Sequence, residues 1–229
     1  MKAHYPIRAV LRFTGPLPRE TRVIGSHVKG VLGTDLADVS RWKRPPHEVF
    51  ANLPTRDFNT GQVTVKPVSG VVKAKVVEAF VKKYGLVSGS IGVGESFTED
   101  VVYFADAQDI LRRAWMGDIE AIREIEQQVA DVLEAVAAVK PQGIELVTEN
   151  LWSFICVLFL LDHAAGKTGV CGNPDCFTPY FIHKRTDQKY CGRQECSSYA
   201  QNRYALGWWE RKGYKLRADR SKAKSAERR

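Results

Sequence analysis

Short stretches of alternating apolar and polar residues, separated by glycine and proline, characterise the first seventy positions of the chain. Residues 7–13 and 62–67 alternate with a period of two, which predicts two short strands because successive side chains of a strand point to opposite faces. Pro16, Gly25 and Pro54 are among the residues that interrupt the pattern. The pattern therefore predicts a mixed, loop-rich beginning and assigns no topology to it.

Helical periodicity begins at Val71 and stops at Gly85. The side chains of Val72, Val76 and Phe80 recur approximately on one face of a helix, and lysines occupy much of the remainder. A glycine directly after the last periodic residue is a common helix stop. The sequence therefore predicts an amphipathic helix between these two positions.

Two further helices are expected after a loop or short hairpin at 86–98. The first covers 100–115 and the second covers 118–139. Asp118 is placed to act as the N-cap of the second helix, because a carboxylate there accepts hydrogen bonds from free backbone N–H groups. Pro141 follows the expected end of that helix.

A strongly apolar run, 151–161, lies in a helix predicted over 145–165 that closes at Gly166. The run is shorter than the roughly 20 residues that a helix needs to cross a bilayer, so it predicts a buried helix. Cys156 within the run is interpreted as a small core residue. The helix leads directly into Cys171, so its packing is expected to fix the position of the cysteine-containing segment.

Four cysteines come after this helix as two close pairs, Cys171 with Cys176 and Cys191 with Cys196. Four residues separate the members of each pair, and fourteen separate the pairs. Thiolates supplied from two turns that fold back on each other form a tetrahedral metal site. We expect structural Zn²⁺, which is redox-inert and accepts four sulfur ligands, with an iron–sulfur cluster as the alternative. A segment this small has little core of its own, so the metal is expected to stabilise its fold.

Positive charge is concentrated in the same part of the chain. Residues 167–229 contain 15 Lys and Arg against 6 Asp and Glu, a net charge of +9, whereas the rest contains 19 against 20. Such asymmetry is typical of proteins that bind a polyanion, above all nucleic acid. Some of the basic side chains are also expected to offset the charge of the thiolates. The candidate contacts to nucleic acid are Lys184, Arg185, Lys189, Arg193, Asn202, Arg203, Arg211 and Lys212.

A last helix is predicted over 197–213, after the final cysteine. Tyr204, Trp208 and Trp209 form an aromatic stripe on it. We expect the stripe to pack against the finger or the preceding domain, with stacking on nucleic-acid bases as the alternative. Residues 214–229 contain almost no apolar side chain and predict a disordered basic tail.

The fold class expected for these 229 residues is α+β. A mixed, then mainly helical N-terminal domain over 1–166 precedes a small treble-clef or ribbon-like four-cysteine zinc finger over 167–213 and the basic tail over 214–229. The N-terminus lacks a signal-peptide pattern and no apolar run is long enough for a membrane span, so we expect a cytoplasmic protein without a membrane partner. Thiols stay reduced in that compartment, which favours metal over disulfides.

The region 145–212 resembles the CGNR-type zinc fingers of bacteria, which often follow a helical domain called ABATE. The resemblance is carried by Asn202-Arg203 and by four sequence segments: CGNPDC, PYFI, HKRTDQKYC and CGRQEC. This chain differs at the last ligand, because Cys196 is followed by Ser197 and Ser198 where the family has Gly-Asn-Arg. The family is regarded as stress-linked transcriptional regulators that bind DNA through the finger, and the resemblance implies that role here.

Two functional hypotheses are consistent with these patterns. The first is a regulator that binds duplex DNA, with an N-terminal domain that senses a ligand or mediates oligomerisation. The second is a protein-interaction module in which zinc only supports the aromatic helix, so that Tyr204, Trp208 and Trp209 meet a protein partner. We expect no enzymatic activity, because four cysteine ligands leave zinc without an open position for water.

Overall fold

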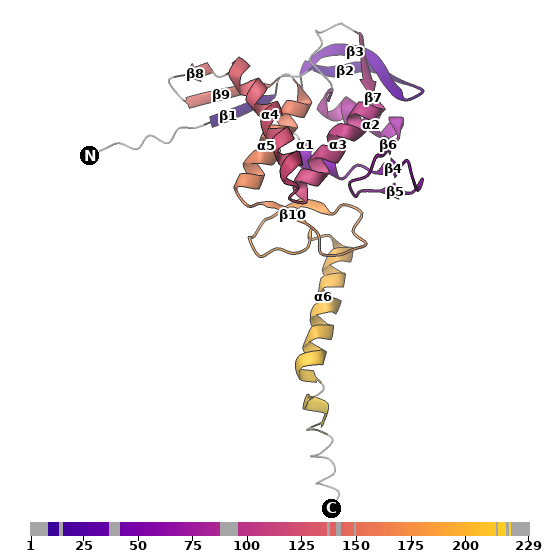
Figure 1. Ribbon diagram of the computed structural model, residues 1–229, viewed down its shortest axis with the longest axis vertical. Coiled ribbons are helices and arrows are strands. Elements are labelled where there is room, and N and C mark those ends of the chain that lie inside the picture. Colours follow the sequence, from indigo (N-terminus) through magenta and orange to yellow (C-terminus); the bar gives the residue numbers. More distant parts are fainter. Residues whose placement is uncertain are drawn as a thin grey trace, which may run out of the picture.

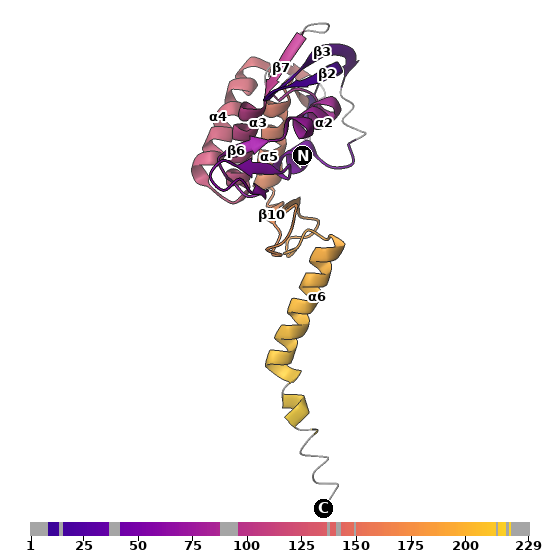
Figure 2. The same cartoon turned by 90° about the vertical axis from the view of Figure 1, so that its right-hand side faces the viewer.

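A body of packed helices with small sheets at its periphery forms most of the molecule, and a four-cysteine module extends from one end of it (Figures 1 and 2). The computed structural model describes residues 9–13, 16–36, 42–87, 96–136, 138–140, 143–148, 150–213, 215–218 and 220. This mixture of helices and short strands confirms the α+β class. The helices of the body are α1 (Pro46–Ala51), α2 (Ala74–Tyr84), α3 (Val101–Trp115), α4 (Ile119–Val136) and α5 (Leu151–Ala164).

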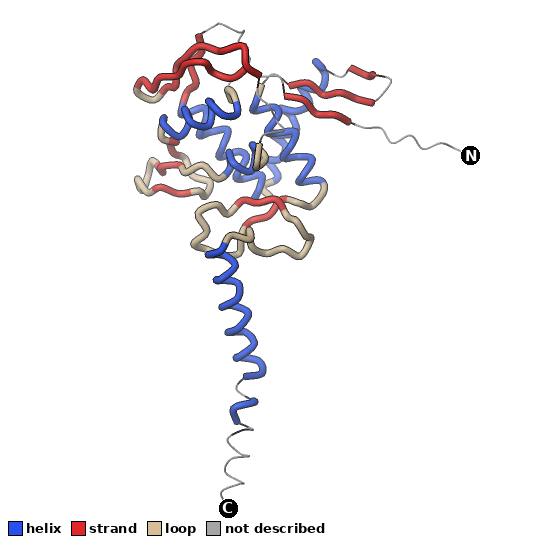
Figure 3. The backbone as a smooth tube through the Cα atoms, turned by 180° about the vertical axis from the view of Figure 1, so that it is seen from behind, coloured by secondary structure: helices blue, strands red, loops and turns tan. Residues whose placement is uncertain are grey.

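Within the described part of the chain, three small sheets lie outside these helices, as Figure 3 shows. The first is antiparallel, in the order β2 (Pro16–Ile24), β3 (His27–Leu36) and β7 (Ser96–Asp100). The second, also antiparallel, has the order β5 (Val63–Thr64), β4 (Thr55–Asp57) and β6 (Gly70–Val72). The third has the order β1 (Ala9–Phe13), β9 (Gly143–Thr148) and β8 (Ala138–Lys140), in which β1 runs parallel to β9.

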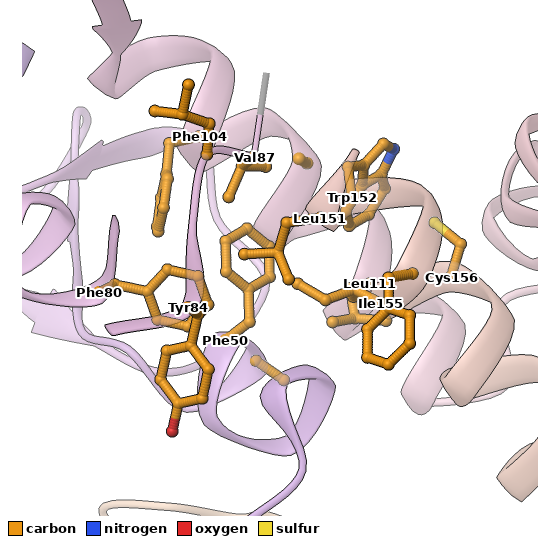
Figure 4. Close-up of a cluster of buried hydrophobic side chains, with 14 of the residues drawn as sticks. Phe50, Phe80, Tyr84, Val87, Phe104, Leu111, Leu151, Trp152, Ile155 and Cys156 are labelled. Carbon is orange, nitrogen blue, oxygen red and sulfur yellow. The ribbon is translucent and has the colours of Figure 1, made fainter. Parts of the chain in front are cut away.

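Aromatic side chains from α1, α2 and α3 meet residues of α5 in the core (Figure 4). The ring of Phe50 lies 4.6 Å from that of Phe104 and 5.3 Å from that of Phe80, measured between centroids. Leu151 and Ile155 of α5 are fully buried in the same cluster. The apolar run is therefore a buried helix as predicted. Among the described residues, no helix combines the length and apolarity required to cross a membrane.

Local capping signals place three helix ends where the sequence predicts them. Asp100 accepts a hydrogen bond from the backbone N–H of Val102 at 2.8 Å, and α3 follows directly. The carboxylate of Asp118 accepts from the N–H groups of the first turn of α4 at 3.0 and 3.3 Å. Gly85 follows α2 with φ of 102°, a conformation that other residues rarely adopt.

The predicted helix over 145–165 is wrong in its first part. Residues 143–148 form β9 instead, and α5 begins only at Leu151. Half of the run Gly-Ile-Glu-Leu-Val-Thr consists of β-branched residues, which favour strand, and a parallel partner, β1, is available for it. Asn150 then starts the helix, because its side-chain oxygen accepts from the N–H of Trp152 at 2.7 Å.

Several other boundaries also differ from the prediction. The helix expected from Val71 begins at Ala74, since residues 70–72 pair with β4 as strand β6. The helix expected to reach 139 ends at Val136, and residues 138–140 form β8. Within 86–98, residues 96–98 belong to strand β7, while 88–95 lie outside the described residues.

The strand prediction is incomplete. Residues 9–13 form β1 as expected, but the run 62–67 contributes only the two residues of β5. The sequence pattern does not indicate the long β2–β3 hairpin, from Pro16 to Leu36. Pro16 and Pro18 lie in the irregular start of β2, where the register with β3 shifts.

Candidate metal centre

A small antiparallel hairpin docks the four-cysteine module onto the body. Its strands are β10 (Thr168–Val170) and β11 (Tyr180–Ile182). The indole of Trp115 donates a hydrogen bond to the carbonyl of Gly169 at 3.0 Å. The side chain of Tyr180 is buried in the core of the body. The module is therefore packed against the helices and is not joined to them by a free linker.

The four predicted ligands converge. One sulfur from each of Cys171, Cys176, Cys191 and Cys196 lies within 4.8 Å of every other. The sulfurs of Cys176 and Cys191 are 3.8 Å apart, which matches the sulfur–sulfur distance of about 3.8 Å at a tetrahedral zinc ion with Zn–S bonds of ~2.3 Å. The cluster is compatible with a metal site.

Each ligand is positioned by a different local structure. Cys171 follows β10, and its N–H donates to the carbonyl of Pro179 at 2.8 Å. Cys176 lies at the end of a turn, in which its N–H donates to the carbonyl of Asn173 at 3.1 Å. Cys191 lies in a loop before Gly192. Cys196 lies in the first turn of helix α6 (Gln194–Trp208), so this helix is anchored at the ligand cluster.

Hydrogen bonds to sulfur support the cluster. The amide of Asn173, which is only 7% exposed, donates to the sulfur of Cys196 at 3.4 Å. The backbone N–H of Cys191 donates to the sulfur of Cys171 at 3.5 Å. Such donors stabilise a negatively charged thiolate and orient it toward a bound metal. The donor set therefore suits a cationic, sulfur-preferring metal.

The thiols differ in their tendency to ionise. Burial raises the pKa of Cys176, and it raises the pKa of Cys191 to about 11. At Cys196 burial acts in the same direction, but hydrogen bonds from Asn173 and from the neighbouring thiols outweigh it and lower the pKa. A metal cation supplies the positive charge that the other buried thiols need in order to ionise.

All eight predicted nucleic-acid contacts are exposed. The structure separates them into two groups. One group surrounds the cysteine loops, and consists of Lys184, Arg185, Lys189 and Arg193. The other lies on α6 and on the π-helical turn η2 (Trp209–Gly213) that continues it, and consists of Asn202, Arg203, Arg211 and Lys212.

The last helix, predicted over 197–213, corresponds to α6 and η2, which project away from the body (Figures 1 and 2). The expectation that its aromatic stripe packs against the finger or the body is wrong for Trp208 and Trp209, whereas the ring of Tyr204 lies 6.5 Å from that of Tyr190 in the module. Tyr204 is 63% exposed, Trp208 42% and Trp209 44%. The projection of the helix explains the exposure, since residues beyond its first turns have no part of the body beside them.

The described part of the basic tail continues as helix. The sequence predicts disorder here, but residues 215–218 are helical. The guanidinium of Arg217 lies 4.6 Å from the centroid of the Trp209 ring, a cation–π contact that holds this turn against η2. Residues 221–229 lie outside the described residues.

Sequence reasoning misses two asparagines that build the site. Asn173 lies between the first two predicted ligands, and nothing in its position indicates the contact with Cys196 across 23 positions of the chain. Asn52 lies in the body, yet its side chain bonds to both backbone groups of Tyr180 at 2.7 and 3.2 Å. His183 is partly buried, with its ring beside that of Phe181.

Comparisons with known proteins identify no relative: the chain matches no protein-family model, no curated protein and no solved structure.

Proposed function

We propose that the four cysteines bind Zn²⁺ as a structural ion. Four buried or half-buried thiols with mutual distances suited to a tetrahedral centre support this choice of metal. The order of ligands, with a turn, a loop and the start of a helix, supports a treble-clef-like module. Four thiolates complete the coordination of zinc, so no position remains for a catalytic water and we assign the ion no role in catalysis.

We further propose that the protein binds duplex DNA through this module and acts as a transcriptional regulator. The observation that carries the proposal is the projection of α6 from the cysteine cluster (Figure 2). Polar and basic side chains are exposed along this helix. Its 15 residues extend about 22 Å in length. An α-helix with its side chains is about 10–12 Å across, which fits the major groove of B-DNA, about 12 Å wide. The motif resemblance to CGNR-type fingers supports the same role.

The two groups of basic residues have different parts in this proposal. Arg203 and Asn202 on α6 can reach base edges, since arginine pairs with guanine and asparagine with adenine. Arg211 and Lys212, together with the basic residues around the cysteine loops, supply contacts to phosphates, which fix the orientation of the helix on the duplex.

Fluorescence anisotropy with a labelled duplex at increasing salt tests DNA binding. The logarithm of the affinity falls by about 0.9 per phosphate contact for each unit of log salt concentration. A triple variant, Arg203→Ala with Arg211→Ala and Lys212→Ala, is expected to bind more weakly and with a shallower slope. A matched control removes three exposed cations of the body, at Arg19, Lys66 and Lys73. Equal affinities of the two triple variants would refute the proposal.

A second candidate function is a protein-interaction module. The exposed stripe of Tyr204, Trp208 and Trp209 favours it, because large aromatic side chains at the surface are typical of binding hot spots. Replacing Trp208 and Trp209 by alanine distinguishes the two functions. A DNA-binding helix that uses only its basic side chains keeps its affinity for duplex, whereas a protein partner recovered by affinity purification is lost.

A further inference from the structure

A cleft lies between the body and the four-cysteine module, and Cys191 of the metal cluster is among its lining residues. It has a volume of about 510 Å³, which is within the range of about 300–1,000 Å³ for small-molecule sites. The segment before α1 forms one side of it, and β11 with the loop after it forms the other. The lining residues that a ligand would meet include Lys43, Arg44, Ile182, Lys184, Gln188 and Arg193.

The cleft is electropositive. Lys43 and Arg44 come from the body, and Lys184 and Arg193 come from the module. Glu48 is the carboxylate among the lining residues, and the guanidinium of Arg44 already pairs with it at 3.1 Å. Apart from Cys191, whose thiolate would be shared with the metal, the charged side chains that remain are positive. They converge from two parts of the chain that are far apart in sequence, so an anion bound there is stabilised from both sides.

The module side of the cleft is already folded. The backbone N–H of Lys184 donates to the side-chain oxygen of Gln188 at 2.9 Å, and the amide nitrogen of Gln188 donates to the carbonyl of Tyr190 at 2.8 Å. These two bonds hold the loop that carries Lys184 in one conformation. A ligand therefore meets a preformed wall and loses little affinity to ordering it.

The wall also has unused hydrogen-bonding capacity. The hydroxyl of Thr178 and Nδ1 of His183 belong to lining residues, and both atoms are buried without a hydrogen-bond partner within the described residues. A buried polar group without a partner is costly, and rotation of either side chain toward the cleft would let it bond to an anionic oxygen.

We propose that this cleft binds a phosphate group. Lysine and arginine in a concave site are the residues that recognise phosphate in proteins, and the half-buried side chains of Pro45 and Ile182 beside them offer apolar surface to the remainder of a phosphorylated molecule. The phosphate belongs either to a small phosphorylated ligand or to the backbone of bound nucleic acid. In both cases the ligand contacts body and module together and couples the two.

Isothermal titration calorimetry with inorganic pyrophosphate tests the small-ligand source, and anisotropy with a labelled duplex tests the nucleic-acid source. The zinc-loaded full-length chain is compared with the charge reversals Lys43→Glu and Lys184→Glu. The matched control is Lys73→Glu, an exposed lysine at the start of α2 and outside the cleft. We expect each cleft variant to bind at least one probe about tenfold more weakly or worse, and the control to bind like the wild type.

The outcomes separate this proposal from DNA binding. Loss of pyrophosphate binding in the cleft variants supports it even where the protein binds no duplex, and loss of duplex binding alone assigns the phosphate to DNA. Absence of binding to both probes overturns it, as does binding that the cleft variants leave unchanged. Zinc content is measured in every variant. A cleft variant that loses zinc together with its phosphate affinity would show that these cations serve the thiolates instead, and would also overturn the proposal.

Discussion

The side-chain amide of Asn52 connects the helical body to the metal module. It donates to the carbonyls of Glu48 and Tyr180, both at 2.7 Å, and accepts from the N–H of Tyr180 at 3.2 Å. In Asn52→Ala the backbone groups of Tyr180 stay buried without partners, which is expected to lower the free energy of unfolding by about 1–3 kcal/mol. Urea denaturation followed by tryptophan fluorescence measures the change. Asn59→Ala, in an exposed turn, is the control, and equal midpoints for the two variants would contradict the role of Asn52.

Asn173 supports one of the proposed metal ligands by a hydrogen bond to its sulfur. Its amide donates to Cys196, and its side-chain oxygen accepts from the N–H of Asp175 at 3.2 Å, which holds the turn between the first two ligands. Loss of a hydrogen bond to a metal ligand typically costs about 10–100-fold in affinity, and we expect that loss for Asn173→Ala. Competition with a chromophoric zinc chelator measures it. Asp175→Ala changes an exposed side chain of the same turn and is expected to keep its affinity.

At the scale of elements, Glu78 joins α2 to β2. Its carboxylate accepts from Lys82 at 3.0 Å, from Thr21 at 2.9 Å and from Lys75 at 3.2 Å, and the bonds from Lys82 and Thr21 contribute most to lowering its pKa from 4.5 to about 2. A carboxylate with a lowered pKa in the folded state stabilises the fold above its unfolded pKa. That contribution disappears as the pH falls from about 4.5 to about 2.

Glu78→Gln is therefore expected to destabilise the protein most at neutral pH. The difference in melting temperature between wild type and variant should shrink as the pH falls toward 2, because the carboxyl of the wild type becomes increasingly protonated. Differential scanning calorimetry across this range measures it. Glu120→Gln alters an exposed carboxylate that pairs with Arg123 on the surface, and it should show little difference at any pH. A constant difference for Glu78→Gln would contradict the assignment.

The same scale shows which elements can be predicted from a sequence. The start of α3 and the start of α4 follow from Asp100 and Asp118, since a cap acts on residues beside it in the chain. The sequence pattern predicts helix where strand β9 lies, because its partner β1 is more than a hundred residues earlier and no local pattern records that pairing. Short apolar runs are ambiguous between helix and strand until such a partner is known.

The candidate site also contains residues that the sequence predicts and residues that it does not. The four cysteines could be predicted, because their spacing in the chain already encodes two turns of a metal site. The role of Asn52 could not be predicted, because its contact with Tyr180 depends on how the body packs. The exposure of Trp208 and Trp209 could not be predicted either, since an aromatic stripe has the same sequence pattern whether it packs inside a protein or faces solvent.

At the scale of the whole molecule, the helical body and the four-cysteine module have hydrophobic cores of very different size. The body buries a large continuous cluster of apolar side chains drawn from its helices and sheets. The module has a separate cluster formed by Phe181 and three of the cysteines, with Tyr190 and Cys191 packed against it. A core this small cannot hold a fold alone, whereas a structural zinc ion contributes about 10–16 kcal/mol of binding free energy.

Removal of the metal is therefore expected to unfold the module and leave the body intact. Hydrogen exchange with and without a strong chelator measures this. Exchange should become fast at 171–178, at 188–196 and in the first turns of α6, because that helix begins at a ligand. Protection in α3 and α5 should persist.

The hairpin β10–β11 should respond to metal removal differently from the cysteine loops. Its strands bond to Trp115 and Asn52 of the body, so its amides should exchange more slowly than the cysteine loops after the metal is removed. A loss of protection throughout the body at the same chelator concentration would contradict this division, because it would mean that the two parts unfold as one unit. Unchanged protection at the cysteine loops would show instead that the module folds without a metal.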